Sequence, residues 1–273
     1  MIVRRVEHPG RAPQLLLIRQ LDHSALSGEF ARRWGRPPFV PPEPLESVVL
    51  AASRHDEGWR EADMRPLYDE RTKGPASFRG LEVRRHIPFY REGIHRIAAL
   101  DPYAGLLVSM HGSGIYQGRY GAGPIRMTTQ TADVRAEMEA FVEEQEAFQA
   151  SLKRGLWAAA GRRRTFEAAV WCHYELLQVW DLLSLFVCID RDRTPVQRIA
   201  PAPTRPGGDD LALEVVASGD QVRVRPWPFT VKAIDAAVPA RAIPDRPYAS
   251  EEEVRGAMDA AEELAVPCHL VPG

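Results

Sequence analysis

The sequence predicts a mainly α protein, with a helical core over roughly residues 21–191 and a small β element made from the N- and C-terminal segments. Three observations carry this prediction. Apolar residues recur at helical spacing through most of the core span, two short β-like runs precede it, and a hairpin pattern follows residue 200. We therefore expect a helical domain with N-terminal strands over residues 1–195. Residues 196–273 are expected to form a β-hairpin and helix extension packed on that core.

Composition excludes several classes of protein. The chain has 35 Lys and Arg against 37 Asp and Glu, a formal charge of −2, which gives no global field toward nucleic acid or an anionic membrane. Its three cysteines are too few and too scattered for a disulfide framework, so we expect reduced thiols in the cytoplasm. The expected partner is a small-molecule substrate, with no nucleic acid and no membrane; a homo-oligomer is left open.

The first elements follow from local patterns. Two β-like runs, residues 2–6 and 15–18, predict a strand pair. A helix then spans residues 20–35, where Leu26, Phe30 and Trp34 recur every four residues, and Asp22 is its expected N-cap. That start places His23 in the first turn. A proline-rich linker, residues 36–44, separates this helix from the next.

The second helix begins near Leu45 and ends in the adjacent pair His55-Asp56. Residues 59–88 lose periodicity, which predicts an ordered but irregular loop, and a helix follows over residues 89–100. Asp101-Pro102 predicts a restart with an aspartate N-cap, and this helix is expected to stop at Gly112. His111 would then repeat the layout of His55, a histidine at the end of an apolar helix, with a glycine-rich loop over residues 112–124.

Two longer helices complete the predicted core, residues 132–160 and residues 165–189. The second is the most apolar and carries Asp181, whose buried charge requires a partner. Beyond residue 200, residues 211–216 and 222–226 predict a hairpin, residues 231–234 and 240–243 predict further strands, and a last helix is expected from Ser250 through Leu264.

Several polar side chains lie in unexpectedly apolar helices. Imidazole nitrogens combined with carboxylate oxygens suit Fe, Mn, Zn, Ni or Co, one or two ions, rather than Mg or Ca. The candidate ligands are His23, His55, Asp56, His111 and Asp181. His173 is a weaker candidate, because eight residues separate it from Asp181, which is about 12 Å along a helix.

The order His23, then His55-Asp56, then Asp181 resembles the HD-domain superfamily of metal-dependent phosphohydrolases, over about residues 21–189. The resemblance implies an HD-like helical bundle in which these residues hold one or two divalent metals and phosphate esters are hydrolysed. His111 would add a ligand in a two-metal variant, which raises a di-iron oxygenase of the HD-like type as an alternative. The wider sequence also resembles an uncharacterised bacterial family, which implies no activity.

The resulting hypothesis is a metal-dependent hydrolase of a phosphorylated small molecule or nucleotide that uses metal-activated water. Glu57 or Glu61 would shuttle the proton, and Arg60 would hold the phosphate as the nearest of several arginines. The other arginines considered are Arg54, Arg96, Arg119 and Arg126. A third hypothesis, a non-catalytic helical protein that binds a metal or ligand, predicts that the four HD-like residues do not converge.

Overall fold

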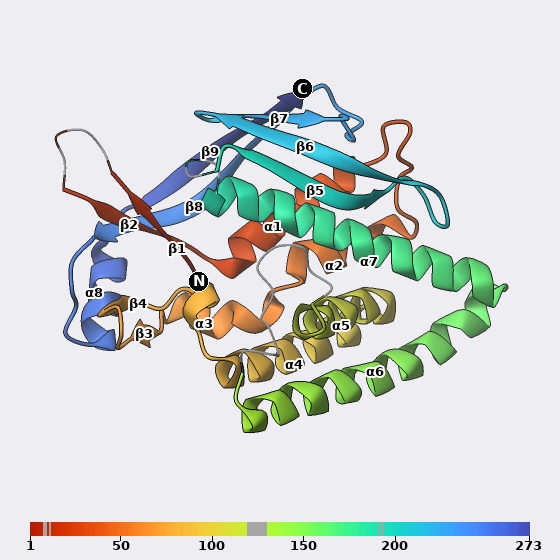
Figure 1. Ribbon diagram of the computed structural model, residues 1–273, viewed down its shortest axis with the longest axis horizontal. Helices are drawn as coiled ribbons and strands as arrows, with labels where there is room; N and C mark the ends of the chain where they lie inside the picture. Colours follow the sequence, from red (N-terminus) through yellow and green to blue (C-terminus); the bar gives the residue numbers. More distant parts are fainter. Residues whose placement is uncertain (8–9, 11, 119–129, 191, 193) are drawn as a thin grey trace.

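The computed structural model describes residues 1–7, 10, 12–118, 130–190, 192 and 194–273. A sheet covers one side of the molecule, and the helices lie beneath it in layers (Figure 1). Helices α1 (Gln20–Arg33) and α7 (Arg163–Leu185) lie directly under the sheet. Helix α2 (Leu45–Arg54) packs on α1, and α5 (Pro102–Tyr116) packs on α2. The outermost layer is formed by α4 (Val83–Leu100) and α6 (Ala132–Ala160).

The prediction of a mainly α bundle with a small β element is wrong. The chain is about 52% helical, but it also builds a large curled mixed sheet of seven strands, which makes it an α/β fold. The error has a physical cause, because two strands, residues 196–203 and residues 263–272, were not expected. Both contain prolines, which are uncommon inside a strand and obscure its local pattern.

The strand order is β1-β2-β8-β9-β7-β6-β5, and all neighbours are antiparallel except β7 and β9. The N-terminal pair joins the C-terminal strands through β2 and β8, with a register running from Gln14 opposite Pro244 to Leu17 opposite Arg241. The strands are β1 (Ile2–Val6), β2 (Gln14–Ile18), β5 (Val196–Pro203), β6 (Asp210–Ser218), β7 (Gln221–Arg225), β8 (Ile234–Pro244) and β9 (Glu263–Pro272). Both predicted parts of the chain therefore contribute to one sheet.

The predicted ends of the C-terminal elements need correction. The hairpin of β6 and β7 is confirmed. Residues 240–243 lie within strand β8, but of the strand expected over residues 231–234 only Ile234 belongs to it. The last helix, α8 (Glu251–Ala260), ends earlier than expected, and Leu264 belongs to β9. Beyond it, Val266, Cys268 and Leu270 are buried on one face, the alternation of a strand between two neighbours.

The predicted helices lie at the expected positions in the sequence, but their first and last residues differ from the prediction. Helix α1 begins at Gln20, so Asp22 is not its N-cap but pairs with Arg19, and His23 lies in the first turn as expected. The N-cap role of Asp101 is confirmed, because its carboxylate accepts from the backbone N–H of Ala104 at 2.8 Å.

Two helices extend beyond the predicted bounds. Helix α4 starts at Val83 instead of residue 89 and carries Pro88 inside its first turns. Helix α5 continues through Gly112 to Tyr116, so His111 lies inside the helix rather than at its end. Residues 112–116 of the glycine-rich loop that was expected there belong to this helix, and residues 119–124 lie outside the described residues.

The segment between α2 and α4, expected to be irregular, contains short elements. They are η1 (Glu57–Trp59), α3 (Arg60–Met64), β3 (Tyr68–Asp69), β4 (Gly74–Pro75) and η2 (Phe78–Gly80). Beyond α7, one turn of π-helix, η4 (Phe186–Asp190), leads to the sheet.

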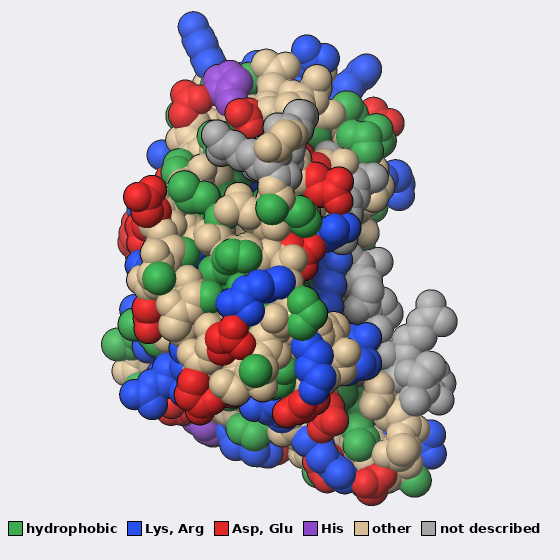
Figure 2. Space-filling view, turned by 90° about the vertical axis from the view of Figure 1, so that its left-hand side faces the viewer, with side chains coloured by type: hydrophobic (Ala, Val, Ile, Leu, Met, Phe, Trp, Pro, Cys, Tyr) green, Lys and Arg blue, Asp and Glu red, His purple; other side chains and the backbone are tan. Residues whose placement is uncertain are grey.

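One helical stretch, Arg163–Ile189, is long and apolar enough to cross a membrane, but 83% of its most apolar window is buried inside the protein. That burial is consistent with the core helix of a soluble protein. On the face seen in Figure 2, acidic and basic side chains are intermixed, without a large region of one sign.

Candidate metal centre

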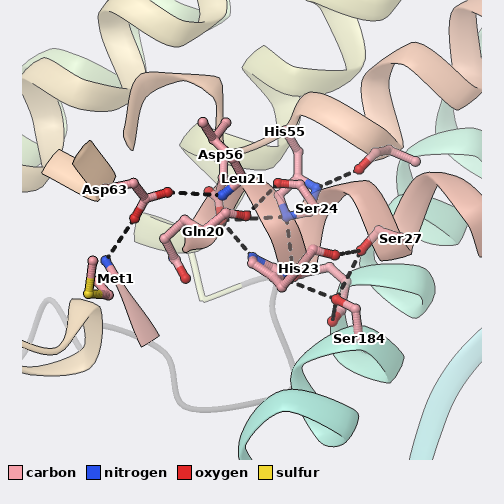
Figure 3. A network of polar contacts seen from close by, with 12 residues as sticks. Met1, Gln20, Leu21, His23, Ser24, Ser27, His55, Asp56, Asp63 and Ser184 are labelled. Atoms are coloured by element: carbon pink, nitrogen blue, oxygen red, sulfur yellow. Dashed lines mark hydrogen bonds and ion pairs between the residues drawn. The ribbon is translucent and has the colours of Figure 1, made fainter. Parts of the chain in front are cut away.

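Five of the predicted ligand residues come together between the helices. His23 comes from α1, His55 and Asp56 from the end of α2, His111 from α5 and Asp181 from α7. All five are buried, with exposed fractions of 5% or less. Figure 3 shows His23, His55 and Asp56 pointing toward one another.

The ligand atoms lie close enough to share an ion. His23 Nε2 lies 2.8 Å from Asp56 Oδ2, and His55 Nε2 lies 3.3 Å from Asp181 Oδ1. Two overlapping groups have all their ligand atoms within 4.8 Å of one another: His23, His55 and Asp56, and His55, His111 and Asp181. His55 belongs to both groups, and its ring centroid lies 4.8 Å from that of His111.

Hydrogen bonding fixes the proton on His55. Its Nδ1 lies 2.9 Å from the carbonyl oxygen of Ala52, which can only accept, so Nδ1 carries the proton and donates it. A neutral His55 then presents the Nε2 lone pair to the carboxylates of Asp181 and Asp56. Within the described residues, neither His55 Nε2 nor Asp56 Oδ1 has a hydrogen-bond partner. Unprotonated acceptors that face one another in a buried site repel unless a cation lies between them.

The electrostatics of the metal-free cluster reflect this crowding. Burial lowers the pKa of His55, but the carboxylates of Asp56 and Asp181 outweigh it and raise that pKa to about 9. Burial raises the pKa of Asp56, yet His55 and His23 lower it to about 2. Burial and the neighbouring His55 lower the pKa of His111 to about 4. Positive charge near the carboxylates therefore stabilises the cluster, and either a proton or a metal cation can supply that charge.

The position of His23 depends on a carboxylate that the sequence did not single out. The residue before α1 offers no side-chain cap, and Asp63 of α3 accepts from the backbone N–H of Leu21 at 3.0 Å instead. Asp63 is fully buried and also lies 3.4 Å from the amino group of Met1, as Figure 3 shows. Nothing in its sequence neighbourhood distinguishes Asp63 from the other acidic residues of this charged segment.

The residues predicted to move protons and bind phosphate contact one another rather than the cluster. Glu57 accepts from Arg60 in a bidentate pair, at 2.7 and 3.0 Å, and Arg54 lies 3.4 Å from the same carboxylate. The side chain of Glu61 is 82% exposed and faces Arg96. Arg119 and Arg126 lie outside the described residues.

His173 lies apart from the five ligands. Its Nδ1 is 2.7 Å from the hydroxyl of Tyr103, and its Nε2 accepts from the backbone N–H of Glu43 at 3.4 Å. Burial lowers its pKa to about 4. These contacts tie α7 to α5 and to the proline-rich linker, which is a structural role.

Comparisons with known proteins give a family without an assigned activity. Residues 1–245 match the model of a family described as "Protein of unknown function (DUF3891)". No curated protein and no solved structure matches the chain.

Proposed function

Because the chain belongs to the DUF3891 family, whose description assigns no activity, we infer its function from the site, and we propose that it is a metal-dependent hydrolase. His23, His55, Asp56 and Asp181 hold a divalent transition metal, and the reaction is attack of water on a phosphorylated small molecule or nucleotide.

The observation that supports this proposal best is the convergence of buried nitrogen and oxygen ligand atoms around His55. The Nε2 atom of His55 lies 3.3 Å from one carboxylate oxygen and 3.7 Å from another, in the buried interior. Two aspartates bring two negative charges, and two neutral imidazoles bring none, so a divalent cation makes the site neutral. That balance removes the cost of burying two carboxylates, which is otherwise several kcal/mol per ion.

The donor set also favours particular ions. Two imidazole nitrogens with two carboxylate oxygens match Fe, Mn, Zn, Ni or Co better than Mg or Ca. A divalent ion of this kind lowers the pKa of a water molecule toward about 7 and polarises a phosphoryl oxygen. The chain contributes ligand geometry, burial that excludes bulk water, and fixed orientation of His55 through the carbonyl of Ala52.

The substrate class rests on the resemblance of His23, His55-Asp56 and Asp181 to the HD-domain phosphohydrolases. Arg60 is a poor phosphate ligand as long as it is paired with Glu57, so Glu57, Arg60 and Glu61 do not enter the proposal.

A second candidate function rests on the second group of ligands. This group, His55, His111 and Asp181, shares His55 with the first group, and His111 is the ligand that it adds, so a second ion would be held by His111 and by the second oxygen of Asp181. Two iron ions there favour the oxygenase alternative over the hydrolase.

The test begins with the metal content of protein purified without chelators. We expect about one transition-metal ion per chain in the wild type and in His173→Gln, and a loss of most metal in Asp181→Asn and His55→Gln. His173 is the matched control, since it is a buried histidine outside the cluster.

Phosphate release from a panel of phosphomonoesters and nucleotides then tests the reaction. The proposal fails if the wild type takes up no metal, or if the metal-loaded protein releases phosphate no faster than Asp181→Asn. Two iron ions per chain with oxygen consumption would instead support the oxygenase.

A further inference from the structure

Both ring nitrogens of His23 already have a partner, so its tautomer decides whether it can bind a metal. Nε2 lies 2.8 Å from Asp56 Oδ2, and Nδ1 lies 2.9 Å from the hydroxyl oxygen of Ser184. A neutral imidazole carries one proton. Nε2 is free to bind a metal only when Nδ1 carries that proton and donates it to Ser184.

The hydroxyl of Ser184 is held in a chain of buried contacts. It donates to the carbonyl oxygen of Asp181 at 2.8 Å, and the hydroxyl of Ser27 donates to it at 2.9 Å. Both serines are 0% exposed, and Figure 3 shows them grouped beside His23. With its own hydrogen directed to a carbonyl, Ser184 offers its lone pairs to the N–H of His23 and to Ser27.

These contacts arise from the packing of α1 on α7. His23 and Ser27 lie one turn apart on α1, and Asp181 and Ser184 lie one turn apart on α7. The backbone carbonyl that orients Ser184 therefore belongs to Asp181, whose side chain is a ligand of the proposed metal. The hydroxyl of Ser184 therefore contacts both proposed ligands: it lies against the ring of His23 and donates to the backbone carbonyl of Asp181.

We propose that Ser184, oriented by Ser27 and by the carbonyl of Asp181, is a positioning residue that holds His23 in the tautomer with its proton on Nδ1. This inference rests on the proposed metal site and adds the hydrogen bond that leaves Nε2 of His23 free to bind the metal. Outer partners of metal-bound histidines act in this way in general, and their loss typically weakens metal binding about 10–100-fold.

The experiment measures metal affinity by chelator competition with Zn²⁺ in four proteins. The wild type is compared with Ser184→Ala, Ser27→Ala and Ser24→Ala. Ser24→Ala is the matched control, because Ser24 is a fully buried serine of α1 whose hydroxyl donates to the carbonyl of Gln20 at 2.8 Å, away from the ring of His23. We expect a loss of about 10–100-fold for Ser184→Ala, a smaller loss for Ser27→Ala, and no change beyond about twofold for Ser24→Ala.

A second readout reports the tautomer itself. With ¹⁵N-labelled histidine, the Zn²⁺-loaded wild type should show the His23 proton on Nδ1 and protected from exchange. Ser184→Ala should lose that protection, and Ser184→Thr, which keeps a hydroxyl, should restore it. If Ser184→Ala acted only by disturbing the packing, the hydroxyl of Ser184→Thr would not restore protection of the His23 proton.

The outcomes separate this inference from the proposed function. Equal affinities for Ser184→Ala and Ser24→Ala, with the His23 proton protected in both, would overturn the inference while the metal site stands. Wild-type protein that binds Zn²⁺ through His23 but hydrolyses nothing would refute the proposed activity alone. If Ser184→Ala does not fold, Ser27→Ala still decides, because it leaves Ser184 in place.

Discussion

At the scale of single residues, burial alone does not decide how a histidine titrates. His55 and His86 are both buried, with exposed fractions of 2% and 5%. Burial lowers the pKa of His86 to about 4, whereas the carboxylates of Asp56 and Asp181 raise the pKa of His55 to about 9. The difference comes from the neighbours, and it separates a packing histidine from one that faces a site for a cation.

The packing histidines make the protein sensitive to acid. His86 and His173 have pKa values lowered to about 4 in the folded state, against about 6.5 in the unfolded chain. Each is neutral when folded, so its contribution is complete above pH 6.5 and is lost as the pH falls from 6.5 to 4. We expect the free energy of unfolding to drop by up to about 3 kcal/mol for each histidine across this window.

Urea unfolding of chelator-treated protein at a series of pH values measures this slope without interference from metal release. His173→Gln should flatten the curve between pH 6.5 and 4, and His95→Gln, at an exposed histidine, is the control that should leave it unchanged. Parallel curves for the wild type and His173→Gln would show that His173 is not the source of acid sensitivity.

At the scale of elements, a close crossing of two backbones holds the His-Asp segment in place. Gly58 follows the proposed ligands His55 and Asp56 and lies against α4, where an added Cβ would come 1.7 Å from the carbonyl oxygen of Phe89. On α4, a Cβ at Gly93 would come 2.5 Å from the backbone nitrogen of Gly58. The partners are backbone atoms, which cannot rotate away, so only glycine allows this approach.

Gly93→Ala should therefore be strongly destabilising, by about 3 kcal/mol or more, and should weaken metal binding as the His-Asp segment shifts. Gly155→Ala is the matched control, because it lies in the exposed part of α6 with nothing within 4 Å of an added Cβ. It should stabilise the protein by up to about 1 kcal/mol through helix propensity. Thermal and urea unfolding measure the stability of both variants. Equal effects of Gly93→Ala and Gly155→Ala would contradict the close backbone contact between Gly93 and Gly58.

The same scale shows what the sequence could and could not predict. Helices such as α6 and α7 were predictable because a 3.6-residue apolar period is local. The sheet was underestimated because β5 and β9 contain prolines and lack a clear strand pattern of their own. Convergence of His23, His55 and Asp181 did not follow from spacing and was expected only from a family resemblance. Asp63 and Ser184 gave no signal, because their roles depend on which helices pack together.

At the scale of the whole molecule, the proposed metal links three helices, α1, α2 and α7, which are separate in sequence. A ligand that binds only the folded state stabilises it, by about 2.7 kcal/mol when the free ligand is at 100 times its Kd. Removing the metal with a chelator should therefore lower the melting temperature, and adding it back should restore it. Asp181→Asn should show no metal-dependent shift in melting temperature. A wild type that melts at the same temperature with and without metal would argue against a site within the core.

The sheet also makes the two ends of the chain depend on each other. Strand β2 pairs with β8, and β5 packs on α7. Phe229, from the C-terminal part, has its ring centroid 5.7 Å from that of Phe30 on α1 and 5.8 Å from that of Trp34, the residue that follows α1. Residues 196–273 therefore cover the sheet-facing sides of the helices that carry His23 and Asp181.

A chain cut at residue 195 should then fail to form the metal centre. It would keep all five predicted ligands, but the apolar faces of α1 and α7 would be exposed and β2 would be left without its inner neighbour. We expect residues 1–195 alone to lack near-ultraviolet dichroism and cooperative unfolding, and to regain both when residues 196–273 are supplied as a separate chain. A well-folded fragment that binds metal as the whole protein does would show instead that the helical part is an independent domain and that the sheet is an addition to it.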